Sequence, residues 1–377
     1  MKKLFSMLLV AVMVFAMVAC NEQTAEPQAP VETQAPAESE APAEPALQEV
    51  VYEAGPLIVG SWGGSLDPVL EEVILPQFKE LTGAEFILDP SYSSTKMVAE
   101  GKGNISVDVG IMGDSEVALL AAHDLVMDID FSRIEMDEFF YEKAHDPTGK
   151  GVFFNWGRYG ILYRTDLVAT PPTSWGDLWS EEYANCVAVN RGSSTAGKQL
   201  LCMAAMLNGG SQYDIDPGFA AMAKLAETNL FAIAESTAMM GQMVTSGDVK
   251  IAGWWDGRTY QLKDSGVPVE FVVPEEGAFA CINEWVISAE TQCPNLAYAF
   301  INLCLKPENQ VFETAATGYG PCDTESVKLL TDDVRARITC TPEEVENLII
   351  LNWTDIAPVE SEWLERYEKE VVSKIQQ

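Results

Sequence analysis

The chain has 377 residues, of which 47% are hydrophobic and 21% charged, and it carries a net charge of −34 at neutral pH. This composition is typical of a soluble globular protein and argues against long disorder or a membrane-embedded body. The negative charge argues against nucleic acid and anionic lipid as partners and would draw cations toward a cleft, although it also serves solubility alone.

Residues 1–19 are predicted to be a secretory signal peptide. Lys2 and Lys3 precede a short apolar run that ends in small residues at Ala19, which is the pattern of a signal peptide. The run is shorter than the about 20 residues that a membrane-spanning helix needs. Cys20 follows directly and resembles the lipobox cysteine of bacterial lipoproteins, which is lipidated. A plain signal peptide followed by a cysteine is the alternative.

Residues 20–54 are predicted to form a disordered tether. The segment consists mostly of Ala, Pro, Glu, Gln and Thr and holds almost no bulky apolar residue before residue 50. Such a chain buries too little apolar surface to offset its ordering entropy. Residues 56–377 then exceed the ~250–300 residues at which a single core stops growing, so two lobes are expected.

Short apolar strands alternate with helical patterns along the rest of the chain, which predicts an α/β fold with a largely parallel sheet. The first helix is expected to be capped by Asp67, to bury Leu81 and to end at Gly83. Asp114 is expected to cap another helix. The strands are predicted at residues 57–61, 84–88, 107–112, 160–163, 186–189, 249–254, 269–273 and 282–287.

Further helices are predicted to begin near residues 256, 294 and 307, with a short capped one at residues 173–179. A last helix at residues 360–375 has a stripe of large side chains at helical spacing that is expected to face the core. In open α/β sheets ligands bind beyond the carboxyl ends of the strands. The segments expected to converge there are residues 62–65, 113–114, 190–195 and 254–256.

The order of several segments also resembles a known family. The segments are residues 60–65 (GSWGGS), 78–83, 156–166, 172–179, 266–277, 297–302 and 318–321. Together they resemble the extracellular solute-binding proteins of ABC importers, and the nearest likeness is to the spermidine/putrescine-binding proteins.

The resemblance implies a two-lobed, type II periplasmic-binding-protein-like fold in which each lobe is a mixed sheet flanked by helices. Lobe 1 would comprise residues 55–155 and about 281–325, and lobe 2 residues 156–280 and about 326–377. Two crossing strands would join the lobes near residues 153–159 and 279–285. Such a receptor, a monomer held at the outer face of the plasma membrane or in the periplasm, would deliver its ligand to an ABC permease powered by an ATPase.

The resemblance also implies ligand-binding residues. Trp62 and Trp255 fall where polyamine-binding proteins place aromatic walls, and Tyr319 matches a ligand-contacting tyrosine. Aromatic faces suit cations. The family's key aspartate in the return strand falls on Asn283, and an aromatic residue there falls on Cys281, so this chain departs from the pattern at both positions.

A polyamine needs carboxylates, because burying an unpaired ammonium group costs several kcal/mol. Asp114, Asp256 and Glu284 are the candidates to supply them, and Asp256 directly follows Trp255. Each of the three is also compatible with a helix cap or with a solvated surface acid.

A second ligand class stays open. Ser194 and Thr195 precede a helix, where hydroxyl and N–H groups form an anion site. Arg158, Arg191 and Arg258 could support a carboxylate or a phosphate. A zwitterionic or anionic small molecule, such as an amino acid derivative or an aminophosphonate, is therefore the alternative to a polyamine.

No enzyme is predicted. His123 and His145 have no nearby nucleophile or metal-ligand partner in the sequence, and neither a nucleophile elbow nor a phosphate loop is present. No catalytic residue, cofactor or metal site is expected. A surface sensor or adhesin built on the same fold is the alternative to a transport receptor.

Cysteine usage leaves the redox state open. If Cys20 carries lipid, seven cysteines remain, so at least one thiol is unpaired within the monomer. Export would permit disulfides, but the spacing does not give their pairing. The seven are Cys186, Cys202, Cys281, Cys293, Cys304, Cys322 and Cys340.

Overall fold

A computed structural model describes residues 50–339 and 341–375. The predicted signal peptide, Cys20, nearly all of the predicted tether and Cys340 lie outside the described residues. At the start of the described chain, the Glu53 carboxylate accepts hydrogen bonds from the N–H groups of Asn295 and Leu296, at 3.0 and 3.1 Å. These contacts attach residues 51–53 to the start of a helix of the folded part.

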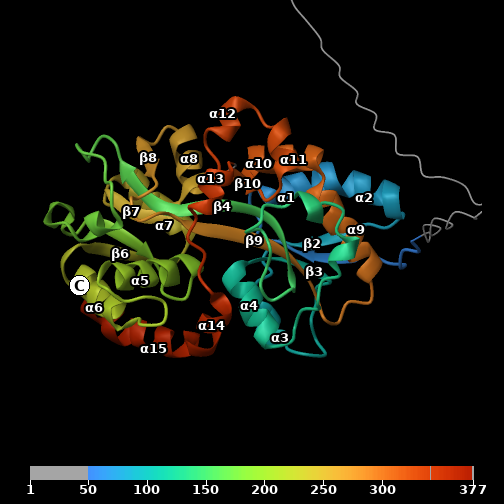
Figure 1. The fold of residues 1–377 in the computed structure, drawn as a ribbon, viewed down its shortest axis with the longest axis horizontal. Helices are drawn as coiled ribbons and strands as arrows, with labels where there is room; N and C mark the ends of the chain where they lie inside the picture. The colour runs from blue at the N-terminus through green and yellow to red at the C-terminus, as the bar shows by residue number, and fades with distance from the viewer. Residues whose placement is uncertain (1–49, 340, 376–377) are drawn as a thin grey trace, which may run out of the picture. The chain divides into compact units, whose positions relative to one another are not determined.

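Ten strands of the described chain form one mixed sheet (Figure 1). The main order is β2-β1-β3-β9-β4-β7-β5-β6, and β8 and β10 pair with β4. The strands are β1 Leu57–Gly60, β2 Phe86–Asp89, β3 Val109–Gly113, β4 Gly151–Arg164, β5 Val187–Asn190, β6 Leu230–Ala234, β7 Ile251–Trp255, β8 Val269–Val272, β9 Phe279–Ile287 and β10 Gly320–Pro321.

The middle of the sheet is antiparallel, so the expectation of a largely parallel sheet is wrong there. Strands β1, β2 and β3 pair in parallel at one end, and β5, β6 and β7 do so at the other. Between them, β9 pairs antiparallel with both β3 and β4, and β4 pairs antiparallel with β7. The alternating pattern predicted the two parallel ends, but it does not specify the direction in which β4 and β9 run.

The long strands β4 and β9 connect two apolar cores. Phe154 and Trp285 lie in a core with the helices near β1 to β3, whereas Ile161 and Phe279 lie in a core with the helices near β5 to β7. The two strands pair from Gly151 opposite Val286 to Tyr159 opposite Phe279. Each strand therefore supplies side chains to one core at one end and to the other core at the opposite end.

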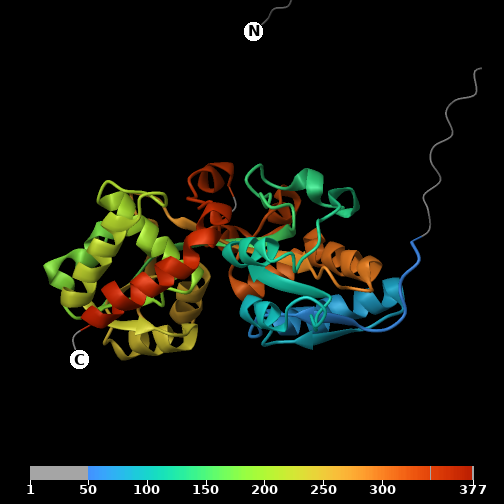
Figure 2. The same ribbon diagram turned by 90° about the horizontal axis from the view of Figure 1, so that it is seen from below.

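The helices cover the sheet in two groups. In Figure 2 the yellow-green α5 and α6 lie beside the red α15 at one end of the sheet, and the blue α1 and α2 lie beside the orange α9 at the other. The helices are α1 Leu66–Val69, α2 Leu75–Thr82, α3 Ser94–Glu100, α4 Asp114–Ala122, α5 Thr195–Leu207, α6 Asp216–Thr228, α7 Thr237–Ser246, α8 Asp256–Asp264, α9 Pro294–Leu305, α10 Pro307–Thr317, α11 Thr324–Leu329, α12 Asp332–Arg335, α13 Pro342–Glu346, α14 Trp353–Ile356 and α15 Glu360–Glu370.

The first helical region starts earlier than predicted. The residue before the first helical turn is Ser65, and Asp67 lies inside α1, where it accepts a hydrogen bond of 2.5 Å from the Ser61 hydroxyl. The prediction that Asp67 is the cap is therefore wrong. Gly83 ends α2 in the left-handed conformation, as predicted, because a residue without Cβ adopts it at no steric cost. Leu81 is 49% exposed rather than core-facing.

Most of the other predicted elements are confirmed with shifted ends. The short segment at residues 173–179 is a 3₁₀ turn, Trp175–Trp179, capped by Ser174. The C-terminal stripe is buried at Trp363, Tyr367 and Val371, as expected. Gly113 rather than Asp114 precedes α4 as its cap. Strand β6 was not predicted, although its sequence is apolar throughout; in the structure Phe231 is exposed at the edge of the sheet.

The six cysteines within the described residues are free thiols. Across those residues we find no helix that is both long and apolar enough to cross a membrane.

Replacing Trp285 by alanine should strongly destabilise the fold. Its side chain is fully buried between Phe154 and Phe300, with ring centroids at 5.3 and 5.0 Å. Loss of a buried tryptophan costs about 3–5 kcal/mol. Phe312→Ala on α10 is the control, because that side chain is 54% exposed and should change the free energy of unfolding by about 0.5 kcal/mol or less. Urea unfolding measures both; equal effects would contradict the assignment of the core.

Candidate functional site

A cavity of about 250 Å³ lies where several strands end, and we call it the Trp62–Trp255 cavity. Its wall comes from the segments after β1 and β2, from the carboxyl ends of β3 and β7, from the starts of α4 and α5 and from the middle of β9. The lining residues are Trp62, Tyr92, Ser93, Ile111, Met112, Gly113, Asp114, Glu116, Thr195, Trp255, Cys281, Ile282 and Asn283.

The structure brings five of the predicted ligand-binding residues together in this wall. They are Trp62, Asp114, Thr195, Trp255 and Asn283. Four of them follow the carboxyl ends of strands or start the next helix, and Asn283 lies in β9 opposite Gly113 of β3. The rule that ligands meet the carboxyl ends of strands therefore explains the convergence of segments far apart in the sequence.

A larger cavity, of about 870 Å³, lies between α7 and α8. It is lined by Trp254, Arg258 and neutral side chains of these helices, and it contains none of the nine predicted ligand-binding residues. Trp254 and Trp255 are adjacent in β7 and point to opposite faces of the sheet, as alternation requires. Trp255 therefore belongs to the Trp62–Trp255 cavity and Trp254 to the α7–α8 side.

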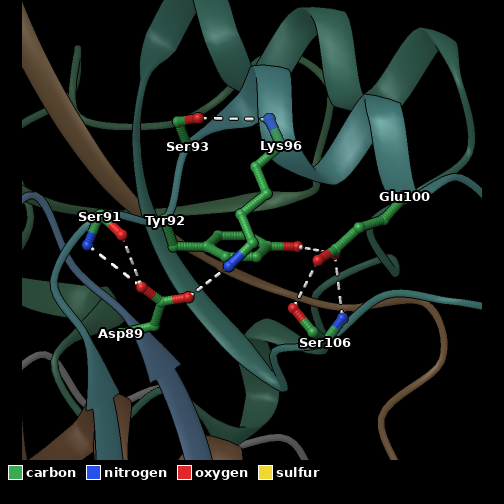
Figure 3. A network of polar contacts seen from close by, with 7 residues as sticks. All are labelled: Asp89, Ser91, Tyr92, Ser93, Lys96, Glu100 and Ser106. Atoms are coloured by element: carbon green, nitrogen blue, oxygen red, sulfur yellow. Dashed lines mark hydrogen bonds and ion pairs between the residues drawn. The ribbon is translucent and has the colours of Figure 1, made fainter.

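A network of polar contacts holds Tyr92, which the sequence did not single out (Figure 3). The Tyr92 hydroxyl donates to Glu100 at 2.7 Å, and Lys96 lies over its ring, with Nζ 4.8 Å from the ring centroid. Lys96 in turn donates to Asp89 at the end of β2. Burial and the nearby Glu100 carboxylate raise the pKa of the Tyr92 hydroxyl. The ring is thus fixed as a neutral aromatic wall.

Asp114 is a buried carboxylate at the first position of α4. Its Oδ2 accepts a hydrogen bond of 2.6 Å from the indole nitrogen of Trp353, and its Oδ1 accepts one of 2.8 Å from the N–H of Ser115. Burial raises the pKa of Asp114 to about 7, although the Trp353 hydrogen bond opposes the increase. Asp114 therefore changes charge close to neutral pH.

Glu116 and Ser115 connect the same helix to its surroundings. Glu116 accepts hydrogen bonds from the Gly113 N–H at 2.9 Å and from the Ser94 hydroxyl at 2.6 Å, so both of its oxygens have partners. The hydroxyls of Ser115 and Thr195 lie 2.6 Å apart and join α4 to the start of α5. Thr195 thus lines the cavity with a hydroxyl that already has a protein partner.

Asp256 lies outside the cavity wall. Its side chain is fully buried, and its oxygens accept hydrogen bonds from the backbone N–H and from Nε of Arg158, at 3.1 and 2.9 Å. A further bond of 2.8 Å comes from the Gly257 N–H. Both oxygens of Asp256 therefore accept hydrogen bonds from the protein itself, and the Arg158 guanidinium is paired with Asp256.

Glu284, Ser194 and Tyr319 also lie outside the wall. Glu284 alternates with Asn283 along β9 and lines an adjoining cavity of about 50 Å³, which shares Asp114 and Ile282 with the Trp62–Trp255 cavity. The Ser194 hydroxyl caps α5 by accepting a hydrogen bond of 3.0 Å from the Gly197 N–H. Tyr319 is buried behind Cys281. The five residues in the wall therefore remain the candidates for ligand binding.

The sequence contained a signal for Tyr92 and Ser93 but not for Trp353. Tyr92 and Ser93 follow the end of β2, and the rule of strand ends applies to that strand as to the others. Trp353 reaches Asp114 from α14, 239 positions away in the chain. No local sequence pattern predicts a contact between residues so far apart in the chain.

Nothing in the described part of the chain groups three or more His, Cys, Asp or Glu side chains as a metal site. The carboxylates and aromatic rings of the Trp62–Trp255 cavity are instead suited to an organic cation.

The sequence of this chain matches a family of known proteins. The family described as bacterial extracellular solute-binding protein matches residues 74–339. The spermidine/putrescine-binding periplasmic protein of Escherichia coli K12 is 25% identical over 309 residues, which cover 78% of this chain and 87% of that protein.

Two solved structures show the likeness of fold. An ABC transporter protein of Clostridium perfringens has a TM-score of 0.73 at 22% identity, and the match covers 84% of this chain and 99% of that one. The spermidine/putrescine ABC transporter substrate-binding protein of Streptococcus pneumoniae has a TM-score of 0.67 at 24% identity, with 83% and 99% covered.

Proposed function

Because this chain belongs to the family of bacterial extracellular solute-binding proteins, we propose that it captures a polyamine such as putrescine or spermidine in the Trp62–Trp255 cavity. The protein is a solute-binding receptor of an ABC importer with the type II periplasmic-binding-protein fold, and it is not an enzyme. The polyamine and the cavity that receives it are the proposal.

The chemistry of the wall carries this proposal. Two carboxylates, Asp114 and Glu116, and three aromatic side chains line the cavity, and none of the described lining residues is a lysine, an arginine or a histidine. An anion would find no charged partner there, whereas an ammonium group would find carboxylates and ring faces. The volume of about 250 Å³ lies below the ~300–1,000 Å³ of drug-sized pockets and fits a small solute.

Of the features that favoured an anionic ligand, only Thr195 lies in the cavity wall, and its hydroxyl is already paired with that of Ser115. Arg191 lines a separate cavity beside α15, and Arg158 is paired with Asp256. The Ser194 hydroxyl is used as a helix cap. A zwitterion or an anion is therefore an outcome of the test below rather than a second proposal.

Delivery to a permease requires a hinge, and we propose that β4 and β9 provide it. The two apolar cores at either end of these strands would be the two lobes, at residues 55–155 with 281–325 and residues 156–280 with 326–377. The cavity wall takes Trp62 and Asp114 from the first of these and Thr195 and Trp255 from the second. A bound solute would then hold the two lobes together.

Calorimetric titration of residues 50–377 tests the function. The panel comprises putrescine, spermidine, amino acids, betaines and aminophosphonates. The proposal expects heat from the polyamines and none from ligands without a free ammonium group. Binding of only zwitterions or anions would overturn the polyamine assignment, and binding of no small solute would favour a sensor or an adhesin.

Trp255→Ala should weaken polyamine binding at least tenfold, which corresponds to about 1.4 kcal/mol. The face of a tryptophan contributes about 0.5–2 kcal/mol to the binding of a cation. Trp179→Ala is the control, because Trp179 is also half-buried but donates its indole N–H to Ala221, outside the cavity. Titration of both variants measures the difference; an unchanged dissociation constant for Trp255→Ala would remove this residue from the site.

Polyamine affinity should rise with pH between about 6 and 8. The pKa of Asp114 is raised to about 7 by burial, so about one tenth of it is ionised at pH 6, while the ligand's amines stay protonated because their pKa values are near 10. Affinity should increase about tenfold over this range and then level off. In Asp114→Asn, binding should be weak and independent of pH; a pH dependence that survives in this variant would contradict the assignment.

We further propose that Cys20 is lipidated and holds the receptor at the membrane through the segment at residues 20–54. Cys20→Ala should then move the protein from the membrane fraction to the soluble extracytoplasmic fraction, because a lipid chain supplies about 0.8 kcal/mol for each buried CH₂ group. Fractionation of expressing cells with immunodetection measures this, and retention of the variant in membranes would overturn the anchor.

A further inference from the structure

The cavity wall is connected to a buried acid on α10 through two asparagines. Asn283 of the wall donates from Nδ2 to Oδ1 of Asn155, at 2.7 Å. Asn155 donates from its own Nδ2 to Oε1 of Glu313, at 2.6 Å. Asn155 is fully buried and Glu313 is 2% exposed.

The backbone places the two asparagines for this contact. Asn155 and Asn283 are cross-strand partners in the β4–β9 ladder, and the register of the ladder shifts between Phe153 and Asn155. Directly opposed residues have side chains on the same face of a sheet and close together. This shift in register places Asn155 opposite Asn283 and not opposite a residue next to Asn283 in β9.

The acid at the end of this series decides which way both amides point. Oε1 of Glu313 also accepts a hydrogen bond of 2.8 Å from the Thr317 hydroxyl. Burial raises the pKa of Glu313 to about 8, but its other oxygen, Oε2, has no hydrogen-bond partner among the described residues and is the atom that a proton would occupy. Oε1 therefore accepts hydrogen bonds in both charge states.

An acceptor at Glu313 requires a donor at Asn155, so Asn155 turns its NH₂ group toward α10 and its carbonyl oxygen toward Asn283. Asn283 must then turn its NH₂ group toward Asn155. The NH₂ group of Asn283 is held by Asn155 through one of its two N–H bonds, so its carbonyl oxygen is on the opposite side of the amide and is the acceptor that Asn283 can offer to the cavity.

We propose that Glu313 is a positioning residue for the ligand, because it fixes Asn155 and through it the orientation of Asn283, which presents a carbonyl oxygen to the Trp62–Trp255 cavity. This rests on the proposed function, since it names the part of the polyamine that is recognised there. A primary ammonium group donates to this oxygen without needing a charge at Asn283. A carboxylate or another carbonyl meets lone pairs instead, which disfavours the anionic end of a ligand at this position.

A double-mutant cycle tests the proposal. Glu313→Gln can offer Asn155 either an oxygen or an NH₂ group, so the direction of both amides is no longer fixed, and putrescine should bind three- to tenfold more weakly. In the background of Asn283→Ala the same substitution should have no further effect on affinity, because the group through which Glu313 acts is gone. Glu308→Gln, on the exposed side of the same helix, is the charge-matched control and should bind as the parent does.

A second readout needs no ligand. The side-chain NH₂ signals of Asn283 in a ¹⁵N spectrum, identified by their loss in Asn283→Ala, should show slowed hydrogen exchange in the parent protein and faster exchange in Glu313→Gln. If the parent protein binds no polyamine, the proposed function fails, while this spectrum still tests the orientation of Asn283.

Two results would overturn the proposal. One is an unchanged affinity together with an unchanged Asn283 signal in Glu313→Gln. The other is a loss of affinity that persists in full in the Asn283→Ala background, which would mean that Glu313 acts only through the fold. If Glu313→Gln does not fold, Asn155→Ala interrupts the same series and is expected to give the same loss and the same absence of effect with Asn283→Ala.

Discussion

The antiparallel pairing of β4 and β9 is the interaction on which the rest of the structure depends. The two strands run from one apolar core to the other in opposite directions, so their overlap, from Gly151 opposite Val286 to Tyr159 opposite Phe279, is the segment that both cores share. The strands on either side end against this pair and bring Trp62, Asp114 and Trp255 to one cavity. If these two strands are the proposed hinge, bending that keeps their register also keeps Asn155 opposite Asn283.

Buried acids are the second constraint, and the chain treats them in two ways. Asp256 is compensated by Arg158, with both of its oxygens hydrogen-bonded. Removing one partner of such a pair leaves an unpaired buried charge, which is why the pair is a structural feature rather than a ligand site. Asp114 has only neutral hydrogen-bond donors, Trp353 and the Ser115 N–H. The charge of Lys198 lowers the pKa of Asp114 against the effect of burial, but Lys198 is itself paired with Glu360. Under the proposed function a ligand cation adds to this compensation.

Much of this site could be predicted from the sequence, because local rules apply to it. Strand ends and helix starts gave Trp62, Asp114, Thr195 and Trp255, and alternation along β7 separated Trp255 from Trp254. Asp256 was named as a ligand candidate because the sequence does not show that Arg158 pairs with it. That pairing depends on the register of β4 with β7, and no local pattern specifies register. Trp353 reaches Asp114, and Glu313 reaches Asn155, across more than 150 positions. Such contacts follow from packing alone.

The change from an aspartate to Asn283 at the return strand is best understood through orientation rather than charge. A carboxylate attracts any cation and accepts hydrogen bonds from every direction, so it needs no partner to present an acceptor. An amide presents an acceptor only if something holds its NH₂ group on the other side, and here Asn155 does so. The position then attracts cations less strongly but still discriminates donors from acceptors, and the attraction is left to Asp114, whose ionisation depends on pH. Under the proposed function, the selection of the ligand's hydrogen-bond donors and the attraction of its charge thus belong to different residues.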